Sequence, residues 1–151
     1  MRILFLFLVL LATSCTTRPA QETAAASPPP IHAVPDAPLR EIHWVLRQLA
    51  GQPVVVPADT REAYLTLRAD GTAEGNGSCN RFRGSFFSAT AGELRFSPLM
   101  STRMSCPAIA TENAFTRVLE QSRTYRISGD TLRVLDAGGT AVARLEAVYL
   151  R

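Results

Sequence analysis

Short apolar segments separated by turn residues recur along the chain from residue 42 onward. In residues 63–69, AYLTLRA, two leucines alternate with Tyr64 and Thr66, which is the period of a strand with one buried face. Asp70-Gly71 follows directly, and this dipeptide is typical of a tight hairpin. The other segments of this kind are residues 42–49, 72–78, 84–87, 93–99, 124–128, 131–136 and 140–150. Their spacing predicts a small antiparallel sheet, either barrel-like or a meander.

One segment has the period of a helix. In residues 106–122 the apolar side chains of Ala114, Phe115, Val118 and Leu119 fall on one helical face. A proline at the second position of this segment suits the first turn of a helix. The pattern predicts one amphipathic helix at residues 107–121, and the residues expected to face water are Arg117, Glu120 and Gln121. We therefore expect a mainly β (α+β) domain in which a single helix packs on the sheet.

The first fifteen residues, MRILFLFLVLLATSC, have the pattern of an export signal. Arg2 precedes an apolar run of ten residues, about half the length that a membrane-spanning helix needs. The exit LATSC resembles the lipobox of bacterial lipoproteins, in which cleavage precedes a cysteine that carries lipid. This predicts a signal peptide at residues 1–14 and lipidation of Cys15. The alternative is an ordinary signal peptide that is cleaved nearby.

A lipidated Cys15 implies a stable membrane anchor, because two or more acyl chains hold a protein on a bilayer. Thr16 follows it, instead of the aspartate that often retains lipoproteins in the inner membrane. We therefore expect an exported protein that is anchored in the outer membrane and faces the periplasm. Residues 15–40 are rich in proline and alanine, which predicts a disordered tether. The remaining residues 41–151 are long enough for one domain with its own core.

The charge is modest but uneven. A formal net charge of +3 is too small to indicate nucleic-acid binding. All sixteen basic residues are arginines, and seven of them fall within residues 79–126, against three acids. This excess fits either an arginine-dotted, solvent-facing surface or a patch for an acidic partner. Arg81, Arg83 and Arg103 lie near the two cysteines of this region and form the candidate patch.

The densest cluster of polar and reactive residues is GNGSCNRFRGSFF, residues 75–87. A catalytic cysteine needs a base or a cation beside it, and the only histidine of the domain, His43, is far from Cys79 in the sequence. A zinc site commonly takes four Cys or His ligands at short spacing, and the domain does not supply them. In an exported protein, Cys79 and Cys106 remain as an even pair once Cys15 carries lipid. This pairing predicts a disulfide.

Other catalytic patterns are lacking as well. The sequence has no nucleophile elbow and no evident pair of catalytic carboxylates. Its glycine-rich loop has neither the lysine of a P-loop nor the spacing of a dinucleotide site. We therefore expect no enzyme activity, no metal and no cofactor.

Five segments together resemble the META domain of HslJ-like heat-inducible bacterial lipoproteins. They are WVLRQLAG, DGTAEGNGSCNRFRGSF, GELRFSPLMSTRMSC, ENAFTRVL and YRISGDTLRVLDAGGTAVARL, and the resemblance covers residues 42–149. The residues that match the family motifs are Trp44, Gly75, Gly77, Cys79, Asn80, Gly84, Thr102, Met104 and Cys106.

The resemblance implies a small β-rich, barrel-like domain with one packed helix and no established enzymatic activity. Members are associated with the cell envelope, with stress response and, in some bacteria, with tolerance of the antibiotic novobiocin. We therefore expect a lipid-anchored, non-enzymatic envelope protein that binds an envelope protein or an anionic ligand. The alternatives are a periplasmic inhibitor of a lytic enzyme such as lysozyme and, less in keeping with the motifs, a hydrolase.

Overall fold

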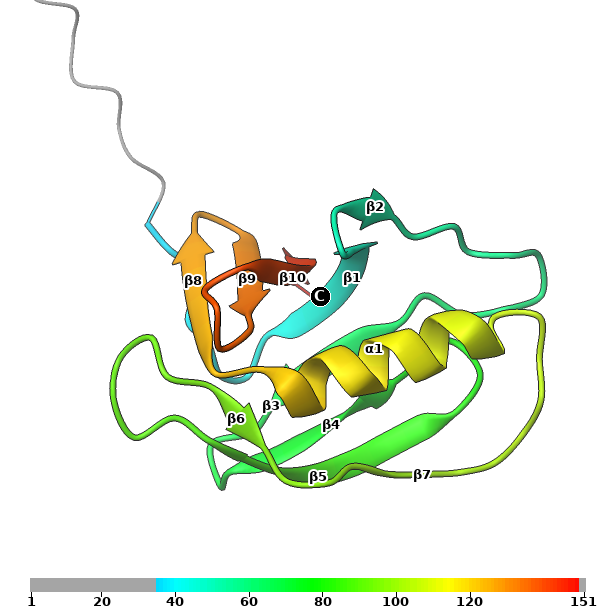
Figure 1. Ribbon diagram of the computed structural model, residues 1–151, viewed down its shortest axis with the longest axis horizontal. Helices are drawn as coiled ribbons and strands as arrows, with labels where there is room; N and C mark the ends of the chain where they lie inside the picture. Colours follow the sequence, from blue (N-terminus) through cyan, green and yellow to red (C-terminus); the bar gives the residue numbers. More distant parts are fainter. Residues whose placement is uncertain (1–34, 150–151) are drawn as a thin grey trace, which may run out of the picture. The chain divides into compact units, whose positions relative to one another are not determined.

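The computed structural model describes residues 35–149 of the chain (Figure 1). The predicted signal peptide, Cys15 and most of the predicted tether lie outside the described residues. The elements are β1 (His43–Leu49), β2 (Gln52–Pro53), β3 (Tyr64–Leu67), β4 (Thr72–Asn76), β5 (Arg81–Phe87), β6 (Arg95–Phe96), β7 (Met100–Ser101), α1 (Ile109–Gln121), β8 (Thr124–Ser128), β9 (Thr131–Leu135) and β10 (Ala141–Val148). Within this part of the chain, no helix has the length and apolar content needed to cross a membrane.

The strands form one antiparallel sheet in the order β6-β5-β4-β3-β1-β10-β9-β8, with β2 paired to β1 and β7 paired to β5. Within residues 35–149 the two ends of the sheet share one isolated bridge, between Glu93 and Thr124. Because β6 has only two residues, it offers no ladder to β8, and the sheet stays open instead of closing into a barrel. The prediction of a mainly β sheet with one packed helix is confirmed.

The helix packs against the inner face of the sheet. Figure 1 shows α1 between the β3–β5 strands and the β8–β10 strands. Phe115 and Leu119 of the helix are fully buried, and the ring of Phe115 meets Phe82 of β5 edge-on, with centroids 6.0 Å apart. The predicted apolar face is therefore the packed face. Other core residues are Trp44, Leu46, Leu65, Leu67, Phe86, Leu94, Leu132, Val134 and Leu145.

The helix begins two residues later than predicted, at Ile109. The carbonyl of Cys106 accepts a hydrogen bond from the N–H of Ile109 at 3.1 Å, so Pro107 lies in a tight turn before α1. The three residues predicted to face water, Arg117, Glu120 and Gln121, are all exposed.

The strands around β5 also differ from the prediction. β5 begins at Arg81 instead of residue 84, because Arg81 already pairs with Asn76 of β4. Only two residues of the predicted strand 93–99 form β6, and Pro98 has no N–H with which to extend a ladder. β2 and β7 have two residues each. Strands this short cannot be recognised from an alternation of apolar and polar residues.

Contacts with the sheet begin at Asp36, within the segment predicted as a tether. A carboxylate oxygen of Asp36 accepts the N–H of Gly129 at 2.7 Å, and the N–H of Ala37 donates to the carbonyl of Gly129 at 3.0 Å. Ala37 is 5% exposed and belongs to the core. The guanidinium of Arg40 lies 4.6 Å from the ring centroid of Phe86. The sequence did not predict these contacts, because residues 36–40 belong to a proline-rich segment and their partners lie far along the chain.

Candidate functional site

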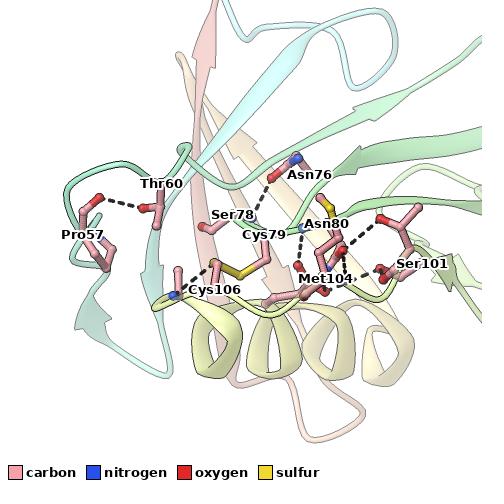
Figure 2. The surroundings of a disulfide bond; sticks show 12 residues. Pro57, Thr60, Asn76, Ser78, Cys79, Asn80, Ser101, Met104 and Cys106 are labelled. Carbon is pink, nitrogen blue, oxygen red and sulfur yellow. Dashed lines mark hydrogen bonds between the residues drawn. A yellow bond between two sulfur atoms is a disulfide. The ribbon is translucent and has the colours of Figure 1, made fainter.

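The two cysteine-containing motifs meet at a disulfide between Cys79 and Cys106, with Cα atoms 5.7 Å apart. Cys79 lies in the turn between β4 and β5, and Cys106 lies just before α1. Figure 2 shows the bridge beside the start of the helix. The predicted pairing is thus present, and it ties the helix to the sheet.

Asn80, next to the disulfide, holds the segment that leads into the helix. Its amide nitrogen donates to the carbonyl of Met104 at 2.9 Å, and its amide oxygen accepts the N–H of Met104 at 2.7 Å. The same oxygen accepts the hydroxyl of Thr102 at 2.9 Å. One side chain therefore binds both backbone groups of a residue, as a neighbouring strand would (Figure 2). Met104 contributes through its backbone, and its side chain is 64% exposed.

Glu112 completes this network, and our sequence reasoning did not identify it. The residue is 6% exposed. One carboxylate oxygen accepts the backbone N–H of Asn80 at 2.6 Å, and the other accepts the side-chain amide of Asn80 at 2.9 Å. Glu112 lies in the first turn of α1, where the helix dipole favours a negative charge. An acid at that position was the available signal. We call Cys79, Asn80, Thr102, Cys106 and Glu112 the Asn80 latch.

The motif glycines serve close chain approach. At Gly77, a Cβ atom would overlap the side chain of Glu112, and at Gly75 it would overlap the carbonyl of Tyr64. At Gly84, it would lie 2.7 Å from Cδ2 of Leu99. Because Gly77 has no side chain, the side chain of Glu112 can approach the backbone closely there.

Trp44, the remaining motif residue, has a different role. Its ring is fully buried in the core. Its indole N–H donates to the carbonyl of Leu39 at 3.0 Å. This bond satisfies the polar end of a buried tryptophan and fixes the segment that enters the domain.

Beside the latch, the outer face of β3, β4 and β5 carries a hollow of about 570 Å³. Arg81 and Arg83 are two residues apart on β5, so both project to this face. Other residues of its lining are Tyr64, Glu74, Met100 and Thr102. We call this feature the arginine hollow.

The predicted basic patch is only partly assembled. Arg81 and Arg83 share the arginine hollow, whereas Arg103 lines a different hollow beside the first turn of α1, with Asn113. Arg81 and Arg83 lie on the same face because they are two residues apart on one strand. Arg103 lies in the loop that follows β7, outside the lining of the arginine hollow.

The described residues offer no metal site: within residues 35–149, no group of three or more His, Cys, Asp or Glu side chains could hold a metal ion. The ring of His43 lies against that of Tyr64 at a tilt of 36°, with ring centroids 4.1 Å apart. Its partial burial lowers the pKa of His43, and the negative charge of Glu62 offsets only part of this lowering.

The fold and the latch define a small open-sheet domain that is tied to its single helix by a disulfide. The META domain matches residues 37–149, and the chain belongs to the META domain family. This agrees with the resemblance noted from the motifs.

Comparison with solved structures gives two further likenesses. An NMR structure of a protein from Burkholderia xenovorans is 24% identical and has a TM-score of 0.59, over 83% of this chain and all of that one. It shows a shared fold. A crystal structure of a DUF4847 family protein from Bacteroides vulgatus is 17% identical, with a TM-score of 0.49, over 59% of this chain and 61% of that one. Comparison with curated proteins finds no match.

Proposed function

We propose that this protein is a lipid-anchored cell-envelope protein of the META family that acts by binding, not by catalysis, in stress response or in tolerance of a novobiocin-type antibiotic. The observation that carries the binding role is the arginine hollow, where two exposed guanidiniums stand beside an exposed methionine. The site is built on strands, so its side chains are held on a rigid support.

The proposed location is supported by two independent features. Residues 1–15 have the pattern of a lipoprotein signal. The disulfide between Cys79 and Cys106 suits a compartment in which thiols are oxidised. Lipid at Cys15 would hold the domain at the membrane through the segment that precedes Asp36.

The anchor can be tested with Cys15→Ser. Wild-type protein grown with an alkyne fatty acid is expected to carry the label and to fractionate with the outer membrane, because two or more acyl chains anchor stably. The variant is expected to lose the label and to leave the membrane fraction. Labelling that persists in the variant would contradict lipidation at Cys15.

Binding through the arginine hollow can be tested by crosslinking in cells followed by mass spectrometry. Charge reversal in R81E/R83E is expected to lower capture of the partner by about tenfold or more, because like charges across an interface cost several kcal/mol. The matched control is R117E/R133E, which reverses two exposed arginines on α1 and β9. Restoration of heat or novobiocin tolerance to a deletion strain gives a second readout. Equal capture and equal tolerance in the two double variants would exclude the hollow as the binding surface.

Inhibition of a lytic enzyme is a second candidate. Glycosidase clefts carry a pair of carboxylates, to which the exposed Arg81 and Arg83 are complementary in charge. A lysozyme assay with the purified protein decides between the two: inhibition that R81E/R83E abolishes would favour the inhibitor.

A further inference from the structure

We propose that the arginine hollow binds a small amphiphilic anion, that is, a ligand with one acidic group on a flat apolar body. This inference rests on the proposed binding function and specifies a ligand class for the same surface. The volume of about 570 Å³ lies within the range of roughly 300–1,000 Å³ found for small-ligand sites.

The charges of the hollow favour an anion. Arg81 and Arg83 are exposed, and neither makes an ion pair with another of the described residues. Glu74 is the acid of the lining, and Arg68 binds its carboxylate at 2.6 Å. Arg68 also pairs with Glu41, at 3.1 Å, so its single positive charge offsets the negative charge of Glu74 only in part. Arg81 and Arg83 thus bring two positive charges to the hollow against one partly offset carboxylate. Planar guanidinium groups bind carboxylate, sulfonate or phosphate oxygens in pairs.

The walls favour a flat apolar body next to the acidic group. Met100 pairs with Arg83 across β7 and β5, so the two side chains leave the sheet on the same face, and Met100 is 74% exposed. Methionine is flexible and polarisable, and it packs well against aromatic rings. On β3, Tyr64 lines the hollow, and its ring is in contact with the ring of His43. An aromatic ligand could pack against the methionine while its acidic group faces the arginines.

The hollow is held in place by the strands and the latch that surround it. Its floor is the continuous register of β3, β4 and β5. Its β7 side is fixed because Thr102, which also lines the hollow, donates to Asn80 of the latch. A site that is held in place in advance loses less conformational entropy when the ligand binds.

The test uses 8-anilinonaphthalene-1-sulfonate, an aromatic sulfonate, with the oxidised mature chain carrying Cys15→Ser. Fluorescence titration is expected to show one saturable site. We expect R81A/R83A to weaken binding about tenfold or more, because both charge-assisted contacts are lost, and M100A to weaken it by about threefold. R117A, which removes an exposed arginine from α1, is expected to bind the dye as the wild type does. N-phenyl-1-naphthylamine, which lacks the sulfonate, is expected to bind the wild type at least tenfold more weakly.

Two results would overturn the inference. One is an affinity for the sulfonate that R81A/R83A leaves unchanged, and the other is equal binding of the neutral analogue. Urea unfolding of each variant shows whether it is folded during the titration. If dye binding ignores the arginines while R81E/R83E still abolishes capture in cells, the surface takes a macromolecule and only the ligand class is wrong. If the arginine substitutions change neither dye binding nor capture in cells, both the ligand class and the proposed binding surface are wrong.

Discussion

Replacing both Cys79 and Cys106 with alanine is expected to lower the free energy of unfolding by about 3–4 kcal/mol. The bridge joins residues 27 apart in the sequence, and a cross-link of that span restricts the unfolded chain by about this much in the chain-entropy model. The loss is a large fraction of the roughly 5–15 kcal/mol that stabilises a small domain.

Urea unfolding measures this loss, with the fluorescence of the buried Trp44 as the signal. Cys15→Ser serves as the background, so that the two bridged cysteines are the only ones in the chain. Reduced protein is the matched control and is expected to unfold at nearly the same urea concentration as C79A/C106A. Alkylation of the oxidised protein should modify neither sulfur. An oxidised protein that is no more stable than the double variant would contradict a stabilising bridge.

Glu112→Gln is expected to lower the free energy of unfolding by about 1–3 kcal/mol, although it changes a single heavy atom. The carboxylate accepts two hydrogen bonds from Asn80, one from the backbone and one from the side chain. A glutamine must turn its NH₂ group toward one of these donors, which leaves a buried donor unpaired. Rotation of the Asn80 amide offers no escape, because its NH₂ would then face the N–H of Met104.

The control for this variant is Glu120→Gln, an exposed position on the same helix. It is expected to change stability by less than about 0.5 kcal/mol. Equilibrium unfolding of both variants, with the disulfide intact, gives the comparison. Amide hydrogen exchange at Asn80 and Met104 should accelerate in E112Q alone. A stable E112Q with protected amides would show that the latch tolerates a neutral side chain.

Local patterns predicted the parts of the fold that depend on neighbours in the sequence. The hairpin at Asp70-Gly71 is present, with Gly71 at φ 87° as its turn requires. The apolar face of α1 was readable because Phe115 and Leu119 follow the helical period. The disulfide followed from the count of cysteines and the expected compartment.

The features that escaped prediction depend on contacts across the fold. A glutamate in an amphipathic helix is expected to face solvent. Glu112 is buried because it packs against Gly77 and Asn80, which no local pattern reveals. Arg103 is close to the cysteines in sequence, but the loop after β7 directs it into another hollow. Ala37 belongs to a proline-rich stretch, and its partner Gly129 is about ninety residues away.

The place where the chain enters the domain decides which contact feels a mechanical load. A pull on the residues before Asp36 would be transmitted first to the two hydrogen bonds that Asp36 and Ala37 make with Gly129, at the tip of the β8–β9 hairpin. Those bonds can peel apart one after the other. Residues 79–106 form a loop that is closed covalently, so stretching the N-terminal end would strip the entry segment long before it could extend the part that carries the arginines.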